Sequence, residues 1–204
     1  MKNALRLTGG LLVVIALALA TSPAKAQTTA NGFYYPTPSW DQTFACTTKA
    51  NCPRFVVLSN FGSAAVLDRE TGLVWEQSPG DTNGDGRVDD TDREDWFAAQ
   101  SRCNDKNVSG RKGWRLPTIQ ELASLVNPDP SVPFPGPMLP PGHPFSNVQP
   151  SIHWSATTSP GTSPTSHAWN VDFFRIGLGR VGADDKTMVH FVWCVRGGQG
   201  VDPQ

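Results

Sequence analysis

The sequence predicts an α+β fold in which an antiparallel sheet carries two helices, a long proline-rich loop and disulfide bridges. Three observations support this prediction. Short apolar runs come first in the chain, two helical patterns follow them, and further apolar runs close the chain after a proline-rich stretch. Because strands and helices are segregated and do not alternate, an antiparallel sheet is expected.

The first strands are predicted at residues 54–58, 64–68 and 73–76, which are apolar runs of strand length. Residues 69–72 (RETG) end in Gly72 and separate the second run from the third. A glycine in so short a connection is typical of a hairpin turn.

Two helices are expected next. The first is predicted at about residues 89–104, since acidic residues fill its first turn and Trp96, Ala99 and Cys103 recur on one face. The second is predicted at 119–126, where Thr118 and Glu121 have the spacing of a capping box.

Proline then dominates the chain, with nine prolines among the 24 residues from 127 to 150. Such a stretch excludes a helix or a central strand. A functional loop and a rigid cover over the core are both open interpretations. Three closing strands are predicted at 152–157, 168–173 and 188–195, with a flexible connection at Gly177, Gly179 and Gly182 before the last.

Residues 81–92 (DTNGDGRVDDTD) match the calcium-loop motif D-x-[DN]-x-[DN]-G. Alternate residues of such a loop direct oxygens to one centre, and Ca²⁺ takes six to eight oxygens. The predicted ligands are Asp81, Asn83, Asp85, the Arg87 carbonyl, Asp89 and Asp92. Gly86 occupies the sharp turn of the motif.

The closing residue of this loop, Asp92, is shorter than the usual Glu, and the loop resembles the dockerin variety of EF-hand loop. A strand precedes it at 73–76 in place of an entering helix. We therefore expect a structural calcium clamp and not a paired sensor site. A solvated acidic loop without metal is the alternative.

Residues 1–26 have the pattern of a cleavable signal peptide, with a basic start, an apolar run and Ala24-Lys25-Ala26 at its end. A secreted or periplasmic location is expected, without a transmembrane segment. Residues 27–204 contain 14 Lys and Arg against 18 Asp and Glu, a formal net charge of −4. This charge does not favour a nucleic-acid partner. Residues 27–53 are expected to form an irregular arm, 54–198 one domain and 199–204 a tail.

The four cysteines are Cys46, Cys52, Cys103 and Cys194. An even number in an exported chain predicts two disulfides, for which three connectivities exist. We favour a local Cys46–Cys52 bridge together with a long-range Cys103–Cys194 bridge.

The motifs GWRLPTIQEL, DRETGLVWE, HWSATT, AWNVDF and VWCVRGG resemble the Lcl C-terminal domain family over about residues 54–198. This resemblance implies a fold related to the C-type lectin-like and formylglycine-generating-enzyme-like folds. It also implies a disulfide from the first helix to the last strand, where Cys103 and Cys194 lie.

The resemblance further implies adhesion or polysaccharide binding. The sugar-binding calcium motif of C-type lectins is incomplete here, since only 127–129 (NPD) and 169–172 (WNVD) approach it. We therefore expect Trp169 and Trp154 to be packed in the core. The four histidines (His143, His153, His167, His190) are scattered, no hydrolase motif is present, and a non-catalytic protein is predicted.

The predicted function is an exported binding or adhesion module with a structural Ca²⁺ site, whose partner is a polysaccharide or a cell-surface glycan. Two alternatives stay open. One is a dockerin-like protein-docking module, and the other is an unrecognised enzyme on a formylglycine-generating-enzyme-like fold.

Overall fold

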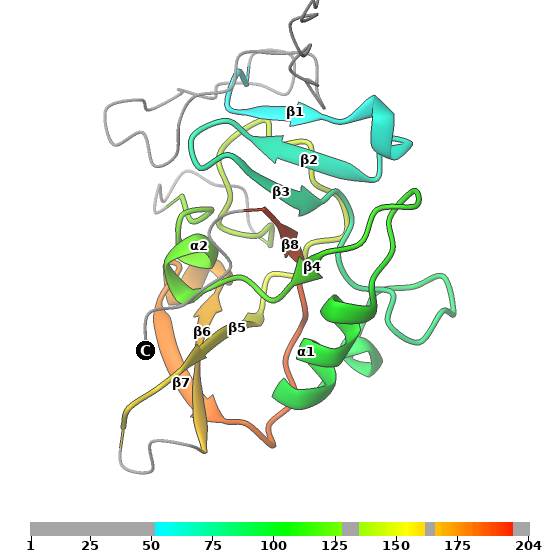
Figure 1. Cartoon of the computed structure of the whole chain (residues 1–204). Helices are drawn as coiled ribbons and strands as arrows, with labels where there is room; N and C mark the ends of the chain where they lie inside the picture. Colours follow the sequence, from blue (N-terminus) through cyan, green and yellow to red (C-terminus); the bar gives the residue numbers. More distant parts are fainter. Residues whose placement is uncertain (1–51, 128–134, 162–165, 198–204) are drawn as a thin grey trace, which may run out of the picture. The chain divides into compact units, whose positions relative to one another are not determined.

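The structure is a computed structural model, and it describes residues 52–127, 135–161 and 166–197. Two antiparallel sheets, two α-helices and one disulfide between described residues make up this part of the chain (Figure 1). The predicted α+β class is confirmed. No helix among the described residues is long and apolar enough to cross a membrane.

The larger sheet has five strands in the order β1-β2-β3-β8-β4. Its strands are β1 (Phe55–Val57), β2 (Ala65–Asp68), β3 (Leu73–Glu76), β8 (Val195–Arg196) and β4 (Trp114–Arg115). The turn between β2 and β3 closes through a hydrogen bond from the Gly72 N–H to the Asp68 carbonyl. Gly72 has a φ of 71°, a conformation that side chains other than glycine rarely adopt, which explains the glycine at this turn.

The smaller sheet has three strands in the order β5-β6-β7. These are β5 (Ile152–Thr158), β6 (His167–Asp172) and β7 (Val181–Asp185), and the pairing of β5 with β6 is irregular between Trp154 and Thr158. The segment after β7 connects the two sheets, because Phe191 bridges to His153 of β5 and Val195 pairs in the larger sheet.

Helix α1 (Trp96–Asp105) buries Trp96, Ala99 and Cys103, which is the predicted face. Helix α2 (Ile119–Ala123) begins at the predicted capping box, with the Thr118 side chain accepting from the Glu121 N–H. Its last turn continues through backbone bonds to Leu125 and Val126 without α-helical geometry. The predicted end at residue 126 is therefore three residues too late.

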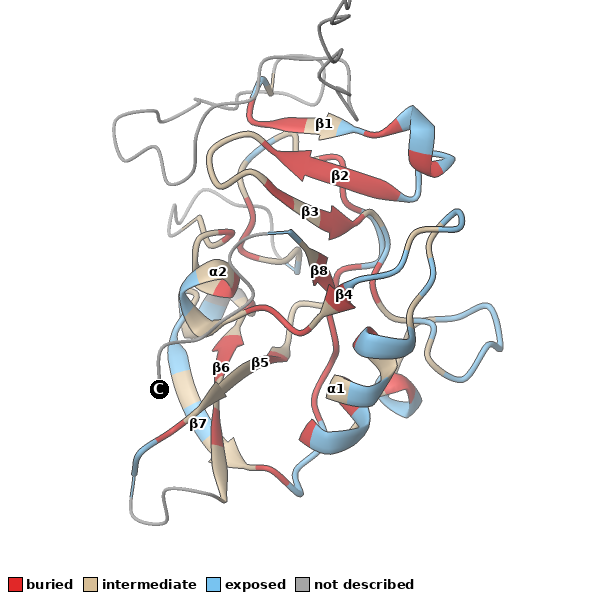
Figure 2. Ribbon diagram, in the orientation of Figure 1, coloured by how far each residue is buried: buried red, intermediate tan, exposed pale blue. Residues whose placement is uncertain are grey.

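The core lies between the larger sheet, α2 and the proline-rich segment. Figure 2 shows the buried parts of the chain in red. Leu139, Phe145 and Val148 come from that segment and pack in the same cluster as Trp75 and Trp193. Residues 135–150 of the proline-rich stretch therefore cover part of the core, and whether this segment also has a functional role stays open. Residues 128–134 lie outside the described residues.

Two predictions about strands were wrong. Residues 188–195 do not form one strand, because only Val195–Arg196 enters a sheet and His190 and Phe191 make isolated bridges to different partners. The glycine-containing segment before it is not simply a flexible connection. It contains β7, which pairs with β6. A glycine is needed at position 182 of this strand because the Asn170 side chain occupies the space that a Cβ would need.

The predicted start of the first helix was also wrong. A 3₁₀ turn, η2 (Asp90–Asp92), is followed by extended residues, and α1 begins only after Asp95. Glu94 exchanges backbone hydrogen bonds with His190, at 2.9 Å and 3.0 Å, so it cannot take part in a helix. A long-range pairing thus overrides the local preference of an acidic first turn.

Candidate functional site

The first half of the loop at residues 81–92 is organised by its own predicted ligands. Asp81 Oδ1 accepts from the Gly84 N–H at 2.7 Å, and Oδ2 accepts from the Gly86 N–H at 2.9 Å. Asn83 Oδ1 accepts from the Asp85 N–H, and Asp85 Oδ1 accepts from the Arg87 N–H. Gly84 and Gly86 have φ of 79° and 82°, so this turn needs glycine at both positions.

The second half is organised around Asp92, whose side chain is buried. Its Oδ1 accepts from the backbone N–H groups of Thr82 and Asn83, and its Oδ2 accepts from the Asp89 N–H at 2.8 Å. Burial by itself raises the pKa of Asp92, but these N–H groups outweigh it and hold the pKa below its ordinary value. Asp92 therefore closes the loop as a carboxylate.

The loop fits a hard cation in part. Carboxylate and amide oxygens accept more than one bond each, so Asp81, Asn83 and Asp85 keep capacity for an ion after their N–H bonds. Asp92 is different, because its Oδ1 already has Thr82 Oγ1 as a third donor. No group of three or more His, Cys, Asp or Glu side chains is gathered as a metal site in the part of the chain that the structure describes.

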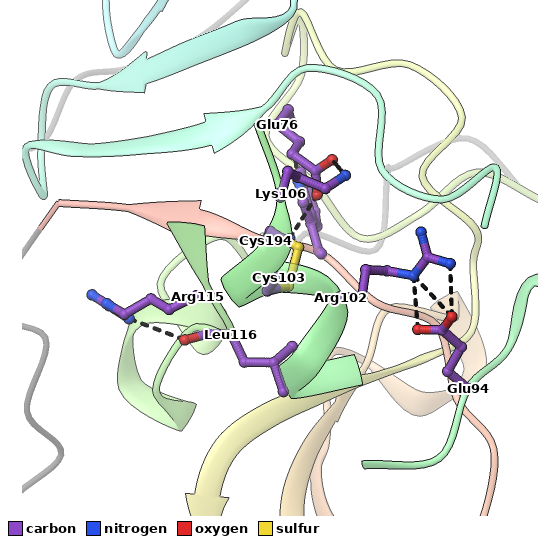
Figure 3. Close-up of a disulfide and its surroundings, with 9 residues drawn as sticks. Glu76, Glu94, Arg102, Cys103, Lys106, Arg115, Leu116 and Cys194 are labelled. Atoms are coloured by element: carbon purple, nitrogen blue, oxygen red, sulfur yellow. Dashed lines mark hydrogen bonds and ion pairs between the residues drawn. A yellow bond between two sulfur atoms is a disulfide. The ribbon is translucent and has the colours of Figure 1, made fainter. Parts of the chain in front are cut away.

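Arg102 ties this loop to the rest of the fold. Its Nη2 donates to the Thr82 carbonyl at 2.8 Å, and its Nε and Nη2 donate to the Glu94 carboxylate at 2.7–2.8 Å. Figure 3 shows the two side chains face to face beside the disulfide. The Glu94 carbonyl accepts from Trp154 Nε1 as well. The loop is therefore fastened to α1 and β5 at one point.

The disulfide next to Arg102 joins Cys103 of α1 to Cys194, immediately before β8 (Figure 3). Its Cα–Cα distance is 5.4 Å, it spans 91 residues of sequence and both cysteines are fully buried. The predicted long-range pairing is confirmed. Cys52 is also disulfide-bonded, and Cys46 lies outside the described residues.

A partly buried ion pair lies beside this disulfide, and no local motif in the sequence indicates it. Lys106 Nζ pairs with Glu76 Oε1, and Glu76 Oε2 accepts from the Cys194 N–H at 2.8 Å. Burial raises the pKa of Glu76, although the nearby Lys106 charge opposes this. Glu76 is the last residue of β3 and Lys106 caps α1, so only tertiary structure brings them together.

The histidines have different surroundings, and His153 and His190 are close enough to interact electrostatically. His153 is buried among the Phe173, Phe191 and Trp193 rings, with Nδ1 3.0 Å from the Ser151 carbonyl. Desolvation lowers its pKa to about 4. His190 Nε2 lies 2.9 Å from Asp184 Oδ2, which also accepts from Asn170 Nδ2.

His143 stacks on Phe145, and His167 Nδ1 lies 2.7 Å from Ser166 Oγ. The described structure thus places each of the four predicted surface or structural histidines against a specific neighbour. The side chains of Asn170, Asp184 and His190 form a polar group. The sequence did not suggest this group, because Asn170 and His190 are 20 positions apart.

The family model of the Lcl C-terminal domain matches residues 64–196. The chain belongs to this family. A comparison with curated proteins found no match. Within this Lcl C-terminal domain lie the loop, both helices and the Cys103–Cys194 disulfide.

The residues of this Lcl C-terminal domain that approach the lectin sugar motif serve other purposes. Asn170 bonds to Asp184, and Asp172 Oδ1 accepts from the Phe174 N–H. Trp154 is fully buried, as expected. Trp169 is only half-buried, so its predicted place in the core was wrong. Asp129 lies outside the described residues.

Proposed function

We propose that this chain is an exported, non-catalytic binding or adhesion module that takes a polysaccharide or a cell-surface partner and is braced by a structural calcium ion. The observation that carries this proposal is the attachment of the 81–92 loop through Arg102. A loop bonded to α1 one residue before the disulfide is well placed to stiffen a scaffold.

Six residues would hold the ion: Asp81, Asn83, Asp85, the Arg87 carbonyl, Asp89 and Asp92. Bound Ca²⁺ would supply positive charge among four carboxylates whose mutual repulsion otherwise opposes the loop conformation. The organised first half supports this assignment most strongly. Asp92 would contribute only with the oxygen capacity that its backbone bonds leave, which favours the weak affinity of extracellular sites, about 10⁻⁴–10⁻³ M.

The non-catalytic proposal is supported by how the reactive side chains are used. Cys103 and Cys194 are buried in a disulfide, and Cys52 is disulfide-bonded. His153 is enclosed by aromatic rings, and His190 lies between Asp184 and the Trp154 ring. These residues therefore act in the described structure as parts of the framework.

Polysaccharide binding rests on the family membership and on a stiff framework that presents loops. A dockerin-like protein-docking role is the second candidate, and one observation favours it. Phe97, on the helix that follows the calcium loop, is 62% exposed. Large apolar side chains exposed beside such a loop are suited to a protein partner.

The test is a glycan array probed with the full chain after export from a bacterial host, in Ca²⁺ and again in chelator. We expect selective binding to a class of polysaccharide that weakens in chelator, and equal binding by a Phe97→Ser variant. Binding to no glycan, with capture of a protein partner that Phe97→Ser abolishes, would replace the polysaccharide proposal by the docking one. Turnover of a bound glycan would contradict the non-catalytic proposal.

A further inference from the structure

Strand β7 is the outer strand of the smaller sheet in the described part of the chain. Two bonds fix which of its backbone groups face β6: Asp172 N–H donates to the Arg180 carbonyl, and Lys186 N–H donates to the Ser166 carbonyl. Because hydrogen-bonded pairs alternate along an antiparallel ladder, the even-numbered residues bond to β6. The N–H and C=O groups of Val181, Ala183 and Asp185 therefore point away from the sheet.

The turn before β7 is apolar and basic. Ile176 and Leu178 are 77% and 58% exposed, and Arg180 is exposed beside them. Leu178 has a φ of 51°, which is unusual for a bulky residue, and Gly179 lies so close to Val126 that a side chain would not fit. The fold thus holds exposed apolar side chains in a strained turn, a cost that a partner surface would justify.

The turn after β7 is apolar and acidic. Met188 and Val189 are each about half exposed, and the Asp184 side chain is 38% exposed while its Oδ2 is held by His190 and Asn170. The only cation of this turn, Lys186, is buried, with Nζ on Thr158 Oγ1 and over the Trp96 ring. Because Lys186 is buried, the exposed face of the turn carries negative charge.

We propose that β7 is a self-association edge, at which β7 of a second copy of this chain adds antiparallel across a two-fold axis centred on Ala183. The two ends of β7 are complementary, and a two-fold axis brings each end against the other. In this register Val181 lies opposite Asp185 of the second copy, and the turn that holds Leu178 lies near the turn of the second copy that holds Met188. Arg180 lies opposite Lys186, whose side chain is buried in its own copy, and diagonal to Asp184, within reach for a long side chain.

Several independent features agree on this one register. The outward-facing residues 181, 183 and 185 pair with one another, as hydrogen bonding across the edge requires. The same centre brings the basic turn before β7 near the acidic turn of the second copy. β7 contains neither Pro nor Lys, which proteins often place in edge strands to prevent pairing, and its charged residues are Asp184 and Asp185. This surface is separate from the calcium loop and goes beyond the proposed function.

Engineered cysteines test the register directly in the full exported chain. Ala183→Cys would place two cysteines opposite each other, about 5.5 Å apart between Cα atoms, which suits a disulfide. Val181→Cys is the matched control on the same exposed edge, and its cysteines would lie about 13 Å apart. We expect a covalent dimer on mild oxidation for Ala183→Cys and not for Val181→Cys. Equal cross-linking of both, or of neither, would overturn the proposal.

Sedimentation equilibrium provides the second arm without a new cysteine. We expect a reversible dimer whose dissociation constant rises at least several-fold in Arg180→Glu and with added salt. Lys112→Glu makes the same charge change at an exposed residue outside both sheets and is expected to leave the dimer unchanged. A chain that stays monomeric at every concentration, or equal effects of the two variants, would refute the proposal.

Discussion

The carboxylate of Glu76 accepts a hydrogen bond from the backbone N–H of Cys194 at 2.8 Å. This bond fixes the end of β3 against the segment that contains Cys194 of the long-range disulfide. Because Glu76 is buried, its negative charge depends on Lys106 for compensation. The disulfide, the ion pair and the sheet therefore form one structural unit at the end of α1.

Lys106→Met is expected to destabilise the protein strongly at neutral pH, because it leaves the Glu76 carboxylate buried without a counter-charge. Breaking a buried pair in this way costs about 3–5 kcal/mol. The loss should shrink as the pH is lowered, since protonation of Glu76, whose pKa burial already raises, removes the uncompensated charge.

Urea unfolding of Lys106→Met, the wild type and Lys112→Met at several pH values measures this loss. Lys112 is exposed, so Lys112→Met is the matched control and should resemble the wild type. An equal, small effect of both substitutions would show that the Lys106 pair contributes no more than a surface contact.

Asp95→Ala is expected to lower the free energy of unfolding by about 1 kcal/mol, because the Asp95 side chain accepts from the Ala98 N–H at the start of α1. Asp105→Ala, at the opposite end of the same helix, removes a carboxylate where the helix dipole disfavours it and should not destabilise. Thermal or urea unfolding compares the two, and a larger loss for Asp105→Ala would contradict the observed start of α1.

Stability is expected to fall as the pH drops from about 6.5 to 4 because His153 is buried in its neutral form. Its pKa is about 4 in the folded chain and 6.5 as a free group, so the unfolded chain binds the proton first. His153 stabilises the fold fully above pH 6.5, and this contribution is lost as the pH falls through that window. The loss amounts to about 3 kcal/mol.

The measurement is the free energy of unfolding against pH, for the wild type and for His153→Leu. The His153→Leu curve should be flatter between pH 6.5 and 4. Desolvation also lowers the pKa of His190, which leaves a smaller slope of the same sign in that variant. Parallel curves would mean that His153 is not held neutral.

Local sequence patterns predicted the elements that form through interactions between residues close in the sequence. The hairpin of β2 and β3, the Thr118 capping box and the buried face of α1 follow from spacing within a few residues, and the structure has them. The family membership and the Cys103–Cys194 pairing were also predictable, because the motifs that resemble the family lie within this sequence and both cysteines lie among them.

The wrong predictions concern segments whose structure depends on contacts with residues distant in the sequence. Glu94 is drawn out of the predicted helix by His190, and residues 188–195 are divided between bridges to different elements. The partners of Glu76 and Asp184 lie on other elements and share no local motif. In the 81–92 loop, calcium ligation stays a prediction, and the sequence did not reveal that Asp92 is surrounded by backbone donors.

Calcium is expected to stabilise the 81–92 loop. At free Ca²⁺ about ten times the dissociation constant, binding should add about 1.4 kcal/mol to the free energy of unfolding. Asp85→Ala should lose most of this gain. Asp90→Ala is the matched control, since Asp90 lies in the same loop, is not a predicted ligand and pairs with Arg93 at the surface. Asp95 is unsuitable as a control because it caps α1.

The most direct measurement is calorimetric titration of the exported chain with Ca²⁺, paired with melting curves in Ca²⁺ and in chelator. The calcium-braced account predicts one site per chain, a melting temperature that rises with Ca²⁺ and falls back in chelator, and loss of both in Asp85→Ala but not in Asp90→Ala. An absence of binding heat together with identical melting curves at millimolar Ca²⁺ would contradict it and leave residues 81–92 as an acidic loop closed by Asp92.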